Sequence, residues 1–264
     1  LAGGFHLLRP QRLWPAVARG VLLAACMLCF FGVSQHITVA QMATGLYTYP
    51  LFITLFAGPV LGERIGPWRI GALVLGAAGC LLVLDPFADG GSYFQMVPVL
   101  AGFFFACNVL VLRRYCRTES PLALAFVVAL VFMLAGFGGA VGLEAFEAPA
   151  SWQQAVPFIF IGWPPLAIGM VGFFACFSAL NLIGNLFFSR AYQTADSSWL
   201  APLDFIYLLF VAMWGRVLFE SWPAPLAWLG MAMIAAAGIV TAMRERRRDQ
   251  SSASPAQATS GRRE

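Results

Sequence analysis

The sequence contains no lysine, and charged residues make up only 11% of its 264 residues. Without lysine the chain has no Walker A phosphate loop and forms no lysine Schiff base with a carbonyl cofactor. It also lacks a serine nucleophile elbow, a His-Glu metalloprotease motif and a paired acidic cluster. These absences argue against an ATP-driven pump and against an enzyme, so we expect no catalytic residue and no cofactor.

Metal ligands are equally sparse in this sequence. The two histidines, His6 and His36, stand alone, and the six cysteines have no histidine or acidic partner at the spacing of a zinc site. We therefore expect no metal site and interpret the cysteines as small apolar side chains.

Apolar residues are what the sequence has in abundance, at 60% of the chain with a mean hydropathy of +0.79. Soluble domains carry about 25% charged residues, so this composition predicts an all-α polytopic membrane protein. About 20 apolar residues cross about 30 Å of hydrocarbon. Eight such spans are predicted, at residues 17–36, 40–61, 68–85, 95–113, 121–143, 166–189, 199–218 and 224–243.

The distribution of arginine predicts the orientation in the membrane. With a cytoplasmic N-terminus, fifteen of the 16 arginines lie inside and only Arg216 lies outside, as the positive-inside rule requires. We therefore expect eight spans with both termini cytoplasmic in a bacterial plasma membrane. The net charge of +4 reflects this topology rather than a nucleic-acid surface. The polar tail at 249–264 is predicted to be disordered.

Two passages of the sequence match each other as an internal repeat. In each, a proline precedes a span that ends at a glutamate, and the next span carries two glycines eight residues apart, a spacing that lets helices approach closely. By charge the two copies have opposite orientations. The first copy contains Pro50, Glu63, Gly71 and Gly79, and the second contains Pro202, Glu220, Gly230 and Gly238.

These passages, together with the run Ala201-Pro202-Leu203-Asp204-Phe205, resemble the EamA-type drug/metabolite transporter superfamily. The resemblance implies ten helices in two inverted five-helix repeats, with a central cavity and alternating access for small metabolites. Residues 1–90 would then form a partial first repeat of three spans, and 91–248 a second repeat of five. We expect that the first two spans of the ten are missing from this sequence and are encoded upstream of Leu1.

Polar side chains within the spans are the candidate substrate ligands, because a polar group in hydrocarbon needs a partner or water. Thr44, Tyr47 and Thr48 share one helical stripe, and Asn181 and Asn185 share another. The full predicted set is Thr44, Tyr47, Thr48, Asn108, Asn181, Asn185, Asp204 and Tyr207. The alternative is that the small polar residues only form hydrogen bonds between helices.

Asp204 is the leading functional candidate, because a carboxylate deep in a span is expensive. Counted from Asp196, it lies about 12 Å into the membrane. Burial raises the pKa of a carboxyl group, so we hypothesise that Asp204 couples transport to protons. The alternative is that Pro202 opens a helix and Asp204 faces the positive end of its dipole. For Glu63 and Glu220 we expect salt bridges with nearby arginines at the helix ends.

The sequence thus predicts a secondary transporter of small organic metabolites embedded in the lipid bilayer. Its partners would be lipid and a small-molecule substrate, with no nucleic acid. The sequence leaves open whether the protein forms a homodimer. The alternative is a non-transporting membrane protein that has a structural or partner-binding role. Polar stripes that converge on one cavity would favour the transporter, whereas stripes buried pairwise would favour the structural role.

Overall fold

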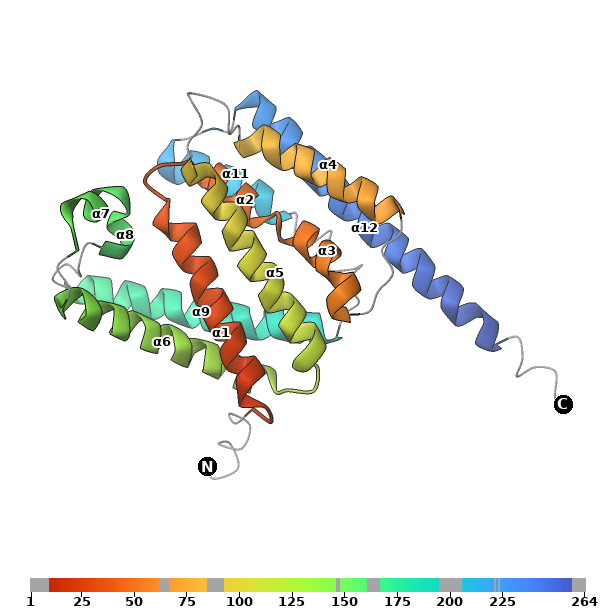
Figure 1. The fold of residues 1–264 in the computed structure, drawn as a ribbon, viewed down its shortest axis with the longest axis horizontal. Coiled ribbons are helices and arrows are strands. Elements are labelled where there is room, and N and C mark those ends of the chain that lie inside the picture. The colour runs from red at the N-terminus through yellow and green to blue at the C-terminus, as the bar shows by residue number, and fades with distance from the viewer. Residues whose placement is uncertain are drawn as a thin grey trace.

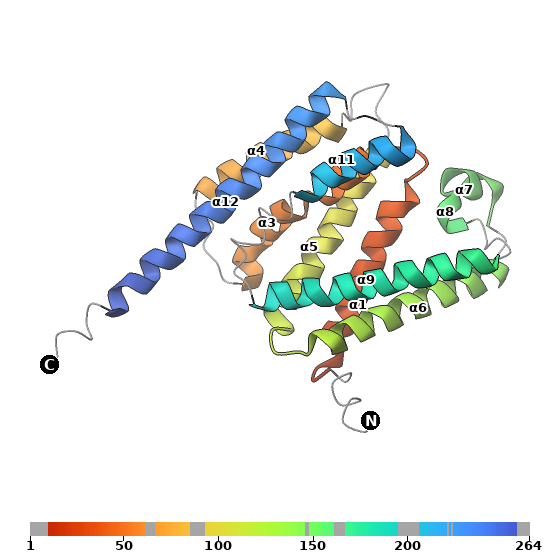
Figure 2. The same ribbon diagram turned by 180° about the vertical axis from the view of Figure 1, so that it is seen from behind.

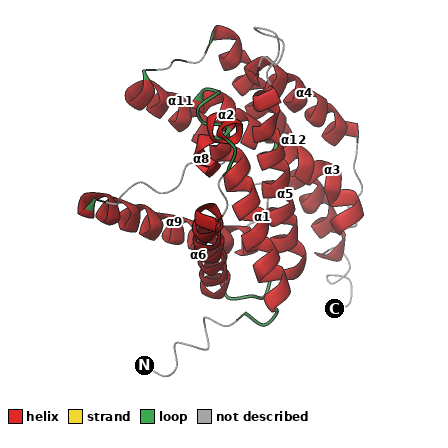
Figure 3. Ribbon diagram, turned by 60° about the vertical axis from the view of Figure 1, so that its left-hand side comes forward, coloured by secondary structure: helices red, strands yellow, loops and turns green. Residues whose placement is uncertain are grey.

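The computed structural model describes residues 10–61, 67–84, 93–145, 148–160, 167–194, 206–220, 222 and 224–257. Every regular element among these residues is a helix (Figure 3), which confirms the predicted all-α class. The helices are α1 (Leu13–Gly32), α2 (Val39–Leu46), α3 (Tyr49–Leu61), α4 (Pro67–Leu84), η3 (Tyr93–Met96), α5 (Val97–Tyr115), α6 (Pro121–Ala145), α7 (Ala150–Ala155), α8 (Pro157–Phe160), α9 (Ile168–Thr194), α11 (Ile206–Phe219) and α12 (Pro225–Gln257).

Four helical segments in the described ranges are long and apolar enough to cross a membrane. They are α1, the continuous segment Tyr93–Tyr115, α6 and α9. Parts of α4 and α12, Ile70–Val83 and Pro225–Val240, are apolar but shorter. The chain is therefore a multi-pass membrane protein, and the full count of eight spans stays a prediction.

The second predicted span, residues 40–61, is not one helix. It is divided into α2 and α3, which are separated by a turn at Tyr47 and Thr48. The cause is Pro50, which has no N–H to donate to the carbonyl group of Leu46 and so cannot continue a helix from α2. The apolar length of the segment predicted a crossing but not this interruption.

Helices α1 and α5 lie side by side at the centre of the structure (Figure 1). Helices α2 and α3 pack against α5 on one side, and α4 and α12 form a long pair beyond them. On the other side α6 packs against α1, and α9 packs along α6 (Figure 2). The central pair is thus flanked by α2 and α3, with α4 and α12 beyond them, on one side and by α6 and α9 on the other.

The α4–α12 pair is held at close range by two glycines. A Cβ atom added to Gly79 would lie 2.6 Å from the carbonyl oxygen of Gly230, and one added to Gly230 would clash with the carbonyl oxygen of Gly79. The predicted close approach is confirmed at this pair. No described atom lies within 4 Å of a Cβ added to Gly71, so that glycine makes no such contact.

The outer pair α6–α9 presents a wide apolar surface. Every residue of 168–184 is exposed, including Phe173, Phe177 and Leu180. Exposed aromatic and aliphatic side chains of this density are stable against lipid tails rather than water. We interpret this surface as facing the bilayer.

The loop between α5 and α6, in the lower part of Figure 1, is fixed by hydrogen bonds to the residues before α1 and to the last turn of α9. The carboxylate of Glu119 accepts from the backbone N–H groups of Gln11 and Arg12, each at 2.8 Å, just before α1. The Gln193 side chain on α9 donates to the carbonyl oxygens of Cys116, at 3.0 Å, and Glu119, at 2.9 Å. We call this network the Glu119 lock.

Helix α12 is described as far as Gln257, which lies within the tail at 249–264. The disorder of this tail stays a prediction. Residues 258–264 lie outside the described residues.

The glycine contact predicts a large effect of Gly79→Val, because the added side chain must push α4 and α12 apart. We expect a loss of about 2–3 kcal/mol in the free energy of unfolding, measured by thermal unfolding in detergent. Gly71→Val on the same helix is the matched control and should change stability little. Equal unfolding temperatures for the two variants would show that α4 and α12 do not touch at Gly79.

The Glu119 lock predicts that Glu119→Gln lowers stability by about 1–2 kcal/mol, because a carboxylate accepting two N–H bonds is replaced by a neutral amide. The measurement is again thermal unfolding in detergent. The control is Glu144→Gln, at an exposed glutamate on α6. If Glu119→Gln unfolds at the wild-type temperature, its carboxylate does not anchor α1.

Candidate functional site

The interruption between α2 and α3 begins with a helix whose start is fixed by its own sequence. Thr38 and Gln41 form a capping box, in which Gln41 N–H donates to the Thr38 hydroxyl at 3.3 Å. The Gln41 side-chain oxygen accepts from the Thr38 N–H at 3.0 Å. A threonine followed three residues later by glutamine is the usual pattern for such a cap, so α2 starts at a defined residue and ends after only two turns.

The turn that follows satisfies its backbone groups through side chains and neighbours. The Thr48 hydroxyl donates to the carbonyl oxygen of Gly45 at 2.7 Å, and Leu51 N–H donates to the carbonyl oxygen of Thr48 at 2.9 Å. Pro50 is the second residue of α3, where a missing N–H is tolerated. The chain can therefore leave one helix and start another within the bundle.

Helix α5 crosses this turn at very short range. A Cβ atom on Gly102 would lie 2.5 Å from the Thr48 Oγ1 and 2.8 Å from the carbonyl oxygen of Leu46. A Cβ atom on Gly45 would clash with Pro98 of α5. The interruption is thus held against α5 at two glycine positions, one on each segment.

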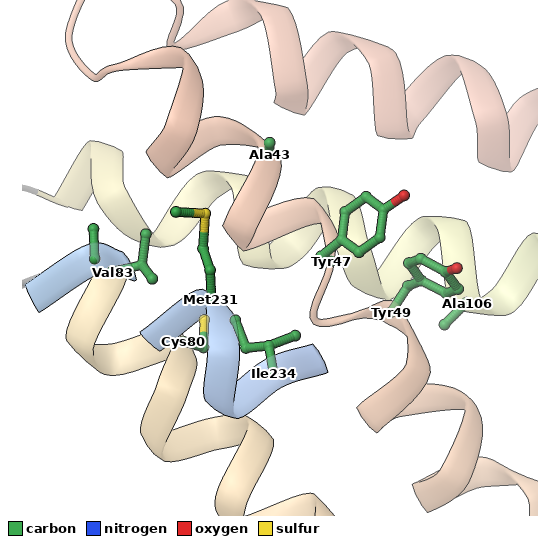
Figure 4. Packing of buried hydrophobic residues seen from close by; sticks show 9 residues of the cluster. Ala43, Tyr47, Tyr49, Cys80, Val83, Ala106, Met231 and Ile234 are labelled. Atoms are coloured by element: carbon green, nitrogen blue, oxygen red, sulfur yellow. The ribbon is translucent and has the colours of Figure 1, made fainter. Parts of the chain in front are cut away.

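Aromatic rings lead from this turn across α5 to α9. Figure 4 shows the rings of Tyr47 and Tyr49 side by side next to Ala106. The ring centroids lie 5.6 Å apart for Tyr47–Tyr49, 4.8 Å for Tyr49–Phe105, 5.7 Å for Phe105–Phe188 and 4.5 Å for Phe188–Tyr192. This aromatic series links three helices and provides flat apolar surface beside the α2–α3 turn.

Four of the predicted substrate ligands are buried along this region. Tyr47 and Thr48 form the turn, and Thr44 lies one helical turn before Thr48 on α2. The hydroxyl of Thr44 is buried and has no hydrogen-bond partner among the described residues. Asn108 is fully buried on α5, one turn beyond Phe105.

Among the remaining predicted residues, the side chains of Asn181 and Asn185 are described. Asn181 is exposed on α9, whereas Asn185 is partly buried, with a buried side-chain oxygen that lacks a partner in the described ranges. Tyr207 belongs to the first turn of α11, but its side chain lies outside the described part of the chain. Asp204, Pro202 and Glu63 also lie outside the described residues.

Arg19 is the functional candidate that the sequence analysis missed. It was counted among the arginines at the cytoplasmic surface, but its side chain is fully buried in α1. Its Nε donates to the Asn108 Oδ1 at 3.0 Å. The sequence did indicate that Arg19 is buried, because it lies two residues inside the predicted span 17–36, where an arginine needs a partner.

The predicted salt bridge at Glu220 is replaced by a backbone contact. Arg216 donates to the carbonyl oxygen of Glu220 at 3.2 Å rather than to its carboxylate. Glu220 has a positive φ of 53°, which turns its carbonyl group back toward the last turn of α11. The arginine therefore caps the C-terminus of this helix.

His36 is not isolated in the structure. Its Nε2 lies 2.7 Å from the carbonyl oxygen of Ala155, and its ring stacks on Phe94 with centroids 3.9 Å apart. These contacts tie the segment after α1 to α7 and η3.

Comparison with known proteins shows which transporters this chain is similar to. Residues 1–85 match the EamA-like transporter family. A protein of Rhizobium johnstonii named riboflavin transporter is 26% identical over 247 residues, which cover 94% of this chain and 76% of that protein. The pseudopaline exporter CntI of Pseudomonas aeruginosa is 27% identical, covering 84% of this chain and 72% of its own.

Two further comparisons agree with these matches. The S-adenosylmethionine uptake transporter of Rickettsia prowazekii is 24% identical over 83% of this chain and 68% of its own. A solved crystal structure with 20% sequence identity superposes with a TM-score of 0.53, over 93% of this chain and 81% of the other, and so shares the fold. The first third of this chain thus matches the EamA-like transporter family, and proteins named as metabolite transporters are similar to it along most of its length.

Proposed function

We propose that this chain is a secondary transporter that carries small organic metabolites across the plasma membrane by alternating access. The observation that carries the proposal is the interrupted helix α2–α3, which places polar and aromatic side chains and non-helical backbone inside the bundle. Interrupted helices at membrane depth are typical of transporter binding sites. A protein with only a structural role would have no need of a buried interruption.

The proposed architecture is a pair of inverted repeats with both termini in the cytoplasm. The contact between Gly79 and Gly230 supports it, since these glycines lie on the corresponding helices of the two predicted repeats. The basic residues at the Glu119 lock support the orientation. Arg113, Arg114, Arg117 and Arg190 all lie in the chain segments that meet there, and such a cluster is expected on the cytoplasmic side.

The aromatic series indicates the class of substrate. Stacked rings bind flat, conjugated solutes through their faces, at about 0.5–1.5 kcal/mol for each favourable pair. The relatives named as riboflavin transporters make riboflavin the first solute to test. Tyr49 is the member of the series that lies on α3, and its ring contacts both Tyr47 and Phe105.

Uptake into proteoliposomes tests the proposal, with riboflavin in a panel of aromatic and aliphatic metabolites. We expect wild-type vesicles to accumulate at least one aromatic solute above protein-free vesicles. Tyr49→Leu should raise the half-saturating concentration about tenfold, corresponding to about 1.4 kcal/mol, while Tyr49→Phe retains the ring and should stay near wild type.

The control is Tyr93→Leu, at a tyrosine that is 93% exposed. It should leave uptake unchanged. Wild-type vesicles that move no member of the panel, with or without an imposed gradient, would favour the alternative of a structural or partner-binding membrane protein. Uptake that is equal in Tyr49→Leu and wild type would remove the aromatic series from the substrate path.

Proton coupling through Asp204 is proposed from its position in the sequence. If its carboxylate takes up and releases the coupling proton, Asp204→Asn should abolish the stimulation of uptake by a pH gradient, because an amide carries no exchangeable charge. The measurement is uptake with and without an inward proton gradient, with Glu144→Gln as the control. Unchanged gradient dependence in Asp204→Asn would exclude the coupling role.

A further inference from the structure

The buried guanidinium of Arg19 has more hydrogen-bonding capacity than its protein neighbours use. Its Nε is bonded to Asn108, but neither Nη atom has a hydrogen-bond partner within the described ranges. The Asn108 Nδ2 is buried and equally without a partner among them. One buried cation and one amide therefore offer unused N–H donors at a single place between α1 and α5.

A purely structural role does not explain why this residue is an arginine. A neutral side chain could donate to the Asn108 oxygen and connect the two helices without bringing a charge into the protein interior. Removing a guanidinium from water costs several kcal/mol unless an anion and further hydrogen bonds compensate. The charge itself therefore requires an explanation.

Helix α9 carries two further polar residues whose buried groups have no partner among the described residues, and they lie at different depths. Ser189 is fully buried and its hydroxyl has no described partner, and Asn185 lies one turn before it. Measured from the Glu119 lock along their own helices, Arg19 lies about 10 Å inward, Asn108 about 12 Å and Ser189 about 6 Å. The contact of Phe105 with Phe188 holds α5 and α9 together beside this layer.

An apolar cluster separates this polar layer from the basic end of the bundle. Its members are Ala16, Leu112, Cys116, Leu124, Val127, Tyr115, Val131, Phe188 and Tyr192. Beyond it lie the lock and the exposed residues Arg114, Arg117 and Arg190. The order from outside to inside is thus surface arginines, an apolar layer and then a buried arginine.

We propose that Arg19 and Asn108 form a binding site for the carboxylate or phosphate group of the transported solute. The two free Nη donors of a guanidinium match two oxygens of such an anion in a bidentate arrangement. The amide of Asn108 adds a donor, and the aromatic series, one turn away on α5 at Phe105, receives the conjugated part. This inference rests on the proposed function and specifies its substrate class as small aromatic anions, a class that does not include the uncharged riboflavin.

A lipid headgroup offers the same phosphate chemistry but fits this position less well. Arg19 is 0% exposed and lies between α1 and α5, behind the apolar cluster. Lipid phosphates lie at the membrane surface, where the exposed arginines would meet them first. The site is therefore assigned to a solute that is enclosed by the protein.

Thermal unfolding of the purified full chain in detergent tests the site without any need for transport. The probes are inorganic phosphate and succinate, compared with chloride at matched ionic strength. A saturating probe should raise the wild-type unfolding temperature by about 5 °C. In Arg19→Gln the probe should no longer raise the unfolding temperature, and in Arg19→Lys it should raise it by only part of the wild-type amount. The control is Arg216→Gln, at an exposed arginine on α11, in which the probe should raise the unfolding temperature as much as in wild type.

Asn108→Asp is the decisive variant, because it supplies a carboxylate from within the protein. The aspartate should pair with Arg19, raise the unfolding temperature in the absence of probe and abolish the response to phosphate and succinate. This variant decides the question even if Arg19→Gln does not fold. A folded Asn108→Asp protein that responds to the probes like wild type would overturn the proposal.

Two further outcomes would also overturn it. One is a wild-type protein that responds to neither probe. The other is stabilisation by phosphatidylglycerol in mixed micelles that requires Arg19 while the soluble anions have no effect, which would assign the residue to lipid.

Transport separates this inference from the proposed function. If wild-type vesicles take up a solute and folded Arg19→Gln vesicles take it up equally well, the anion site is wrong and the transporter stands. If the anions stabilise the protein through Arg19 but no solute moves, the site stands and the transporter is wrong.

Discussion

The arrangement depends on one constraint, namely that backbone N–H and C=O groups inside hydrocarbon must find partners within the protein. The chain meets this constraint in an unusual way at Tyr47 and Thr48, where it leaves one helix and starts another. The hydroxyl of Thr48 satisfies one carbonyl group, and α5 passes so close at Gly102 that lipid is excluded. Helix α5 thus covers the interruption on one side, and α5 in turn packs against α1.

The two ends of the central pair are built differently. Near the interruption, α5 contacts its neighbours through small residues and aromatic rings, whose shapes are complementary. At the other end, the Glu119 lock relies on charged and polar hydrogen bonds. Glu119 is buried, so opening this end would leave its carboxylate and two backbone N–H groups unpaired unless water replaced the lost bonds.

Hydropathy was enough to predict the helical class and the location of most helices, because apolar length reports directly on burial in lipid. The glycine spacing predicted that the helices carrying Gly79 and Gly230 can approach a neighbour closely, and in the structure these two glycines meet. The interruption at Tyr47 was missed, since the segment is apolar throughout and Pro50 alone does not distinguish a helix start from a kink. Arg19 was misplaced because the positive-inside rule treats every arginine as interfacial. The burial of Arg19 depends instead on Asn108, which lies on a helix distant in sequence. Glu119 drew no notice, because its two partners are backbone groups that no sequence pattern reveals.

The position of Arg19 links the two ends of the molecule. Its helix begins directly after the backbone groups held by Glu119, and its guanidinium lies beyond the apolar cluster that the lock holds together. A buried cation without an anion favours any rearrangement that admits water or a counter-ion. Binding an anion removes this driving force and stabilises the closed arrangement. Arg19 can therefore bind the charged group of a solute and also favour the closed state of the protein. It does so because the solute binds the closed state more tightly than the open state, which is the difference in affinity that a population shift requires.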